Sequence, residues 1–173
     1  MLNTLGLSDF DQMYRLMEAS FPQDEYRPYA GQKALFGDPS YHVYARFDNA
    51  HTLLAFLAVW DFEHFAFIEH FAVAPNCRNQ GLGGRMLQEL TAVLSKPLCL
   101  EAELPDTELA KRRLEFYQRN GFCVNPYPYM QPALADTQNP IPLRILTYPS
   151  PISQWEFNRL RDALYPKVYG VMP

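Results

Sequence analysis

Three of the chain's eight glycines fall within four positions, at 81, 83 and 84, directly after an apolar run. They belong to the stretch VAPNCRNQGLGGRMLQEL, whose second half has the spacing of a helix. The unsatisfied amides at a helix N-terminus, together with the helix dipole, bind anions, and glycines let a ligand approach the backbone. Arg78 and Arg85 add charges that suit phosphate groups, so the turn predicts a site for a diphosphate.

The spacing excludes two common phosphate-binding signatures. A nucleoside-triphosphate P-loop needs a lysine and then a serine or threonine after its last glycine, whereas Gly84 is followed by Arg85 and Met86. A dinucleotide fingerprint needs a glycine at the position of Met86. The diphosphate must therefore belong to another kind of ligand.

The composition limits the partners of the chain. Its 173 residues carry a formal net charge of −4 at pH 7, which argues against general binding of nucleic acid or anionic membranes. No apolar run reaches the roughly 18 residues of a membrane span, and the N-terminus lacks the pattern of a signal peptide. We expect a soluble, cytoplasmic protein.

Cysteine and histidine positions predict neither disulfides nor a metal site. Cys77, Cys99 and Cys123 lack paired CxxC spacing, and the four histidines are scattered along the chain. Cys77 lies beside the turn, but no histidine is placed by sequence to activate it as a nucleophile. We therefore expect reduced cysteines and no metal.

Hydrophobic spacing predicts the elements before the turn. A helix is expected from Ser8 to about Phe21, followed by an irregular segment with a short helix near 32–36. The strands are expected at 41–47, 51–62 and 65–74, the first two forming a hairpin. The third strand is apolar except for Glu69 and His70, which indicates that both of its faces are covered.

A helix after the turn is predicted with one buried stripe, made of Leu82, Met86, Leu90, Val93 and Leu94. A strand at 98–103 then precedes a helix that is capped by Asp106 and stopped at Asn120–Gly121. This order gives a second strand and helix pair.

The last third of the chain is rich in proline but keeps strand-like residues. Strands are expected at 121–126 and 141–148, joined by a long loop at 127–140. Ser153 and Glu156 form a capping box, which predicts a final helix that ends near Leu164.

The sequence Arg78-Asn79-Gln80-Gly81-Leu82-Gly83 resembles the acyl-CoA signature [Q/R]-x-x-G-x-[G/A] of the GNAT superfamily of N-acetyltransferases. The stretch RRLEFYQRNGF at 112–122 is similar to the second signature of that family, a helix with a tyrosine before Gly-Phe. The resemblance implies an α/β (α+β) fold with a mixed, largely antiparallel sheet of about six or seven strands flanked by helices. It also implies one acyltransferase domain over 1–173, with 150–173 as a C-terminal helical extension.

The resemblance implies that acetyl-CoA is the cosubstrate. The amides of the turn would hold its pyrophosphate, and the backbone of the preceding strand would pair with its pantetheine arm. The residues implied in this binding are Phe71, Ala72, Val73, Arg78, Asn79, Gln80, Gly81, Leu82, Gly83, Gly84 and Arg85. Many family members carry an asparagine seven residues before the tyrosine, where this chain has Ala110, so that contact departs from the family pattern.

Tyr117 and Glu69 are the candidate catalytic residues. The resemblance implies that Tyr117 protonates the departing thiolate, whereas a plain reading of its helix places it in a core stripe. Glu69 interrupts an apolar strand, so it is either a base with a raised pKa acting through a water or a carboxylate held by a neighbouring strand. His70 is expected on the opposite face of the strand. By resemblance, a bulge in the strand would let the amide of Phe71 meet the oxyanion.

The expected reaction moves the acetyl group directly to a primary amine of a small molecule or peptide. Loops at 23–36 and 125–132 would shape the acceptor site, with Tyr127 and Tyr129 as pocket walls or as surface tyrosines. The alternatives are a non-catalytic acyl-CoA-binding module of the same fold and an interaction protein whose turn only makes a tight corner. A homodimer is plausible because the proline-rich C-terminal part carries aromatic residues.

Overall fold

Four antiparallel strands make the sheet of the first half of the chain. The computed structural model describes residues 2–172, which divide after Pro97 into two compact units. In the first unit the strands lie in chain order, β1 (Asn3–Thr4), β2 (Tyr41–Phe47), β3 (Leu53–Asp61) and β4 (Ala66–Val73). The predicted hairpin is confirmed, whereas the short β1 strand was not predicted.

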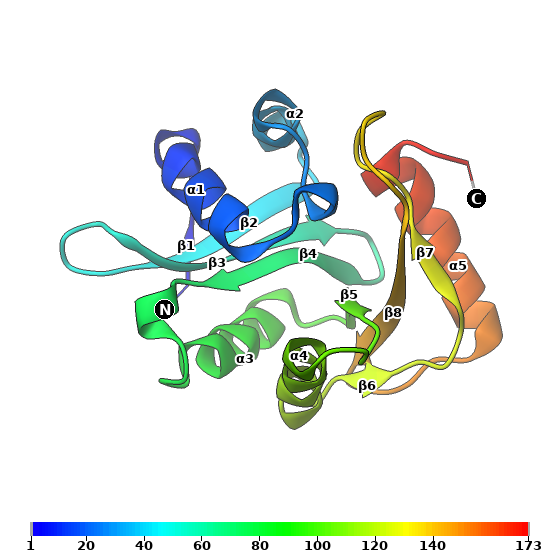
Figure 1. The fold of residues 1–173 in the computed structure, drawn as a ribbon. Helices are drawn as coiled ribbons and strands as arrows, with labels where there is room; N and C mark the ends of the chain where they lie inside the picture. Colours follow the sequence, from blue (N-terminus) through cyan, green and yellow to red (C-terminus); the bar gives the residue numbers. More distant parts are fainter. Residues whose placement is uncertain (1, 173) are drawn as a thin grey trace. The chain divides into compact units, whose positions relative to one another are not determined.

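Helices cover both faces of this sheet. In Figure 1, α1 (Phe10–Ser20) and α2 (Tyr29–Ala34) lie on one face and α3 (Leu82–Leu94) lies on the other. Strand β3 is therefore buried along almost its whole length. Single turns of 3-10 helix connect the elements, η1 (Leu7–Asp9), η2 (Gln23–Glu25), η3 (Leu35–Gly37) and η4 (Pro75–Cys77).

The helices of the first unit follow the apolar spacing of the sequence. In α1 the residues Phe10, Met13 and Met17 are fully buried, as a stripe of period 3.6 requires. In α3 the predicted stripe holds for Leu82, Met86 and Leu90. It is wrong for Val93, which is 60% exposed because the helix has by then turned that position away from the sheet.

Strand β4 contains one more residue than its partner β3. Ala58 pairs with His70 and Val59 pairs with Ile68, so Glu69 is the extra residue of a β-bulge. A bulge interrupts the alternation of side chains between the two faces. The expectation that Glu69 and His70 point to opposite faces is wrong, since both side chains contact the segment at 25–27.

The second unit is organised around a single long strand, β8 (Ile141–Tyr148). Antiparallel to it run β5 (Leu98–Glu103), β6 (Cys123–Val124) and β7 (Tyr129–Gln131). The expected loop at 127–140 therefore contains a strand that was not predicted, because the prolines around β7 hide its short pattern.

Two helices complete the second unit. Helix α4 (Glu108–Arg119) packs on β5 and β6, and α5 (Gln154–Leu164) lies along β7 and β8 (Figure 1). Thr107 rather than Asp106 caps α4, because the Thr107 hydroxyl is the group that accepts from the amide of Ala110. Helix α5 is followed by one turn of π-helix, η5 (Tyr165–Tyr169).

The fold is mixed α/β with largely antiparallel strands flanked by helices, as predicted. Residues 2–172 contain eight strands rather than six or seven, since β1 and β7 are too short to show in the sequence. In that part of the chain no helix has the length and apolar character needed to cross a membrane.

We expect Ser153→Ala to destabilise the protein by about 1 kcal/mol. The Ser153 hydroxyl accepts from the Glu156 amide, and the Glu156 carboxylate accepts from the Ser153 amide, as the capping box predicted. Urea unfolding measures the loss, and Ser153→Thr, which keeps the hydroxyl, is the matched control. An equal loss in both variants would contradict the capping role.

Candidate functional site

The turn between β4 and α3 bends sharply at two residues with left-handed backbone. Asn79 has a φ of 59° and Gly81 a φ of 73°. A Cβ atom at Gly81 would lie 3.1 Å from the Arg85 guanidinium, so both the backbone and the space favour glycine. Alternating backbone conformations of this kind make concave surfaces of N–H groups that bind anions.

Side chains of the turn brace its own backbone. The Arg78 Nε donates to the Val73 carbonyl at 2.9 Å, and the Arg85 guanidinium donates to the Gln80 carbonyl at 3.2 Å. Gln80 in turn donates to the Asn76 carbonyl at 2.8 Å. Both arginine side chains are therefore held at the turn and remain exposed to solvent.

The N-terminus of α3 differs from those of the later helices. Thr107 and Ser153 cap α4 and α5, whereas Gly81 gives α3 no side-chain cap. The first amides of a helix have no partner within the helix. At α3 these amides belong to Leu82, Gly83 and Gly84, and they are the donors available to an anion.

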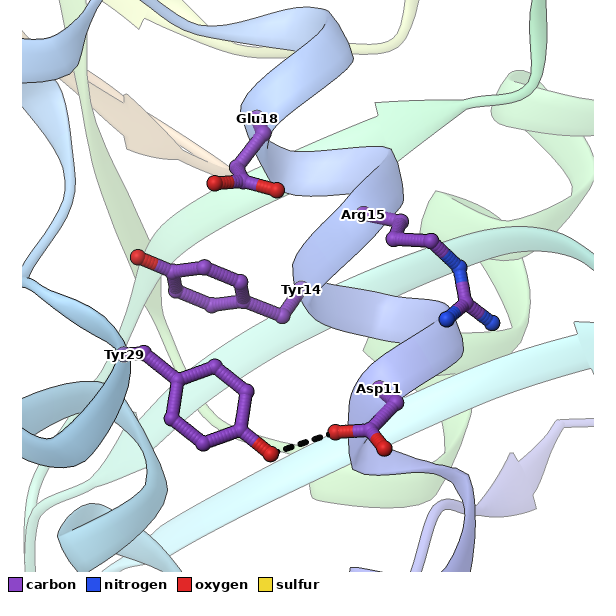
Figure 2. Close-up of a pocket in the computed structure, with 5 residues that line it drawn as sticks. All are labelled: Asp11, Tyr14, Arg15, Glu18 and Tyr29. Atoms are coloured by element: carbon purple, nitrogen blue, oxygen red, sulfur yellow. Dashed lines mark hydrogen bonds between the residues drawn. The ribbon is translucent and has the colours of Figure 1, made fainter.

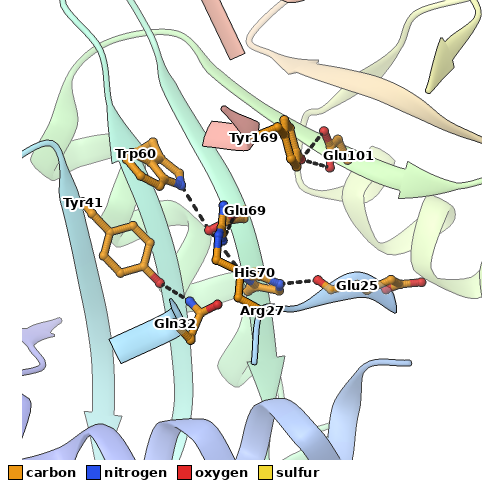
Figure 3. Close-up of polar contacts among 9 residues, drawn as sticks. All are labelled: Glu25, Arg27, Gln32, Tyr41, Trp60, Glu69, His70, Glu101 and Tyr169. Carbon is orange, nitrogen blue, oxygen red and sulfur yellow. Dashed lines mark hydrogen bonds and ion pairs between the residues drawn. The ribbon is translucent and has the colours of Figure 1, made fainter. Parts of the chain in front are cut away.

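Glu69 is held in a buried network in the first unit (Figure 3). Its side chain is 3% exposed and forms an ion pair with Arg27, whose Nη1 lies 2.6 Å from the Glu69 Oε1. The Trp60 indole donates to the other carboxylate oxygen at 3.1 Å. Next to this group, the Gln32 amide donates to the Tyr41 hydroxyl at 2.9 Å.

The pKa of Glu69 is lowered, so the expectation of a raised pKa is wrong. Burial alone raises the pKa of this carboxyl, but the charge of Arg27 and the hydrogen bonds from Arg27 and Trp60 outweigh it, and His70 lowers the pKa further only when its ring is protonated. Glu69 is therefore ionised near neutral pH, and both of its carboxylate oxygens have partners in Arg27 and Trp60. The network agrees in part with the alternative of a carboxylate held by a neighbouring strand, since Trp60 belongs to β3, whereas Arg27 comes from the loop at 25–27.

His70 is buried next to Glu69 and is neutral. Burial lowers its pKa, although the charge of Glu69 and the contact with the Glu25 carbonyl partly oppose this. The Nε2 atom lies 2.7 Å from that carbonyl and donates to it. In the neutral ring the other nitrogen, Nδ1, then carries no proton, and it lies 3.7 Å from the Glu69 carboxylate. The bulge thus anchors the 25–27 segment with two side chains of β4.

Tyr117 lies in the second unit, on α4. Its ring packs against Phe116 and Phe122, and the hydroxyl has no hydrogen-bond partner within residues 2–172. Burial raises the pKa of Tyr117 to about 12, while the charge of Arg113 lowers it and that of Glu103 raises it. Tyr117 is therefore a protonated phenol at neutral pH, and the residue is half-buried.

Glu101 on β5 was not singled out in the sequence. Figure 3 also shows its carboxylate, which accepts hydrogen bonds from the Tyr169 hydroxyl at 2.7 Å. The Tyr129 hydroxyl donates to the same carboxylate at 2.5 Å. The one signal available in the sequence was a charged residue inside an apolar strand.

A hollow of about 420 Å³ lies beside α1 (Figure 2). It includes none of the predicted catalytic or coenzyme-binding residues, but Tyr29 belongs to the loop at 23–36 that was expected to shape the acceptor site. The hollow is lined by Asp11, Tyr14, Arg15, Glu18 and Tyr29. The Tyr29 hydroxyl donates to Asp11 at 2.6 Å. Residues 2–172 contain no group of three His, Cys, Asp or Glu side chains that could hold a metal ion.

The chain belongs to the GNAT acetyltransferase family, because the model of the acetyltransferase (GNAT) family matches residues 10–122. It is 32% identical over 111 residues to YjbC of Bacillus subtilis, a protein assigned as an acetyltransferase. That match covers 63% of this chain and 55% of the relative, so the chain spans little more than half the length of YjbC.

Solved structures have the same fold. A Bacteroides thetaiotaomicron protein assigned as a GNAT-family acetyltransferase superposes with a TM-score of 0.90 at 32% identity, covering 99% of each chain. An aminoglycoside 6'-N-acetyltransferase complexed with coenzyme A superposes with a TM-score of 0.62 over 85% of this chain and 95% of its own. At 14% identity, the second similarity shows the fold alone.

We expect Glu69→Gln to lower the free energy of unfolding by about 3 kcal/mol at pH 7, because it leaves the buried Arg27 charge without its counterion. A carboxyl whose pKa is lowered by folding stabilises the protein above its unfolded pKa of about 4.3 and loses that effect as the pH falls through the folded value. The difference between the two proteins should therefore shrink below about pH 4.

Urea unfolding at several pH values measures this difference. The control is Glu115→Gln, since Glu115 is exposed and lies 3.9 Å from Arg119. Little change is expected there. A loss at Glu69 that does not depend on pH would show that the ion pair is not its cause.

Proposed function

We propose that this chain transfers an acetyl group from acetyl-CoA directly to a primary amine. The observation that carries the proposal is the uncapped N-terminus of α3 behind the left-handed Gly81, flanked by two exposed arginines. Membership of the GNAT family and the coenzyme A bound by a structural neighbour support acetyl-CoA as the cosubstrate.

The turn fits the pyrophosphate of coenzyme A. The amides of Leu82, Gly83 and Gly84 would donate to its oxygens, and the dipole of α3 favours its charge. The guanidinium groups of Arg78 and Arg85 would add charge-assisted contacts. Asn79 and Gln80 shape the backbone at the entrance of the turn.

The end of β4 would receive the pantetheine arm. Phe71, Ala72 and Val73 lead from the bulge into the turn, and the arm would pair with their backbone as a strand does. The bulge lies at Glu69, two residues before Phe71. The Phe71 amide is the proposed donor to the oxyanion that forms when the amine attacks the thioester carbon.

Tyr117 is the proposed general acid. A primary ammonium loses two protons during acetylation, one to solvent before attack and one as the new amide bond forms. The carbon–sulfur bond breaks as the thiolate leaves, and Tyr117 gives the thiolate a proton that the amine's second proton replaces. Burial raises the pKa of Tyr117 to about 12 even though the charge of Arg113 lowers it, so the phenol keeps its proton until the thiolate and the amine's second proton are both present.

Glu69 is proposed as a positioning residue. Its ion pair with Arg27 holds the 25–27 segment against β4, in the region where acceptor-shaping loops were expected. A carboxylate that is buried and paired has neither the access nor the pKa of a general base. Water would then remove the first proton of the amine.

Arg78→Ala and Arg85→Ala should each weaken coenzyme A binding about tenfold, because each removes a charged contact to the pyrophosphate. Isothermal titration calorimetry measures the affinity. The effect should vanish with pantetheine, which has the same arm but no pyrophosphate.

The control variant is Arg112→Ala, which removes an exposed arginine of α4. We expect it to bind coenzyme A as the unmodified chain does. Equal weakening in all three variants would point to net charge alone, and the turn would then lose its assigned role.

Tyr117→Phe should lower kcat at least about a hundredfold and leave coenzyme A affinity unchanged. The phenol is protonated at neutral pH, and the variant removes only the proton donor. The measurement is thiol release from acetyl-CoA over a panel of primary amines, with Tyr148→Phe as the control. Coenzyme A binding without turnover in the unmodified chain would instead favour the non-catalytic acyl-CoA-binding module.

A further inference from the structure

The cations of helix α4 differ in the partners that hold them. Lys111 and Arg119 pair with glutamates of α4 itself. Arg113 instead reaches strand β5, where its Nη1 donates to the Glu103 Oε2 at 2.7 Å. Glu103 is the last residue of β5. This ion pair therefore joins the middle of α4 to the end of the strand on which α4 packs.

Arg113 lies on the face of α4 that is turned toward the strands. Residues three and four apart share a helix face, so Ala110, Arg113 and Tyr117 follow one another along it. Ala110 is 4% exposed, which shows that this face is directed inward. The side chain of Arg113 is 37% exposed and that of Glu103 is 34% exposed. The ion pair thus lies at the margin of the packed face, one helical turn before the proposed acid.

The pair brings a fixed charge of each sign close to the Tyr117 phenol. The charged groups that act on this phenol are Arg113 from α4 and Glu103 from β5. Helix α4 also packs on β6, which consists of Cys123 and Val124 and contains no Asp, Glu, Lys or Arg. Arg113 favours the ionised phenol and Glu103 opposes it. The two members of the pair therefore act on Tyr117 in opposite directions.

The proposed reaction gives the Tyr117 oxygen a partial negative charge. The phenol O–H bond breaks as the S–H bond of coenzyme A forms, and the second proton of the amine then restores the phenol. Between these two events the charge lies on the Tyr117 oxygen. A cation that is already held in place stabilises such a charge without any reorganisation.

The ion pair itself contributes little to stability. Water screens a pair whose side chains are this exposed, so its loss should change the free energy of unfolding only slightly. What the pair does achieve is to hold the guanidinium at the end of a long, flexible side chain. Either member can therefore be replaced without unfolding the chain.

We infer that Arg113, held by Glu103, is a positioning residue for the acetyl transfer, because it keeps a positive charge beside Tyr117 while that side chain gives up its proton. This inference rests on the proposed function, in which Tyr117 is the general acid. Arg113 acts through Tyr117, and Glu103 acts through Arg113.

The first test measures the ionisation of Tyr117 by NMR, without substrate. The full chain carries tyrosine labelled with 13C at Cζ, and the Tyr117 signal is the one that Tyr117→Phe lacks. At about pH 11, a phenol with a pKa of about 12 is about one tenth ionised. Glu103→Gln should raise this fraction at least about twofold, and Arg113→Met should lower it at least about twofold. Any other pair of results in folded variants would overturn the inference.

The second test is kinetic and uses the amine of the panel that is acetylated fastest. Arg113→Met should lower kcat about tenfold and leave the KM for acetyl-CoA unchanged. Arg113→Lys keeps the charge and should restore kcat to within about threefold of the unmodified chain. The matched control is Lys111→Met, which removes a cation of the same helix whose partner also lies on that helix. It should leave kcat unchanged.

These tests separate the role of Arg113 from the proposed function. A chain that binds no coenzyme A and acetylates no amine would contradict acetyl transfer, whatever the titration of Tyr117 shows. An active chain in which Arg113→Met keeps its full kcat would contradict the role of Arg113 alone. If Arg113→Met does not fold, Glu103→Gln decides, because an unchanged ionised fraction of Tyr117 in that variant would overturn the inference.

Discussion

The bulge at Glu69 is the constraint on which the first unit depends. One extra residue in β4 brings Glu69 and His70 to the same 25–27 segment, where they hold Arg27 and the Glu25 carbonyl. A carboxylate and a guanidinium can be buried together only when each satisfies the other. The 25–27 segment is therefore fixed at the point where the pairing of β4 with β3 shifts by one residue, shortly before the glycine turn.

Hydrophobic period and turn chemistry were enough to predict most of the fold. The β2–β3 hairpin, strand β4, helix α5 and its capping box follow from local spacing and from Ser153 and Glu156. Strand β7 did not, because three residues among prolines carry too little pattern. The cap of α4 also differed, since Asp106 and Thr107 are both good caps and only the backbone geometry selects one.

The candidate site was predictable only where it is local in sequence. The glycine turn is continuous, so its residues could be named in advance. The Arg27–Glu69 pair joins residues 42 positions apart, and the Tyr169–Glu101 contact joins residues 68 positions apart. Nothing in a single sequence couples such positions. A pattern of period two also gives no sign of a bulge. For this reason the predicted face of His70 and the predicted rise in the pKa of Glu69 were both wrong.

The two strand carboxylates differ in the kind of donor that holds them. Arg27 gives Glu69 a full counter-charge together with a hydrogen bond, so that pair is suited to fixing a backbone segment. Tyr129 and Tyr169 give Glu101 hydrogen bonds from neutral phenol groups, which fix the direction of the carboxylate and connect β7 and the turn η5 to β5. The same side chain thus holds a loop segment on β4 and joins three elements of the second unit on β5. Arg27 and Tyr169 lie 42 and 68 positions away from the carboxylates that they hold, so neither contact could be read from local sequence.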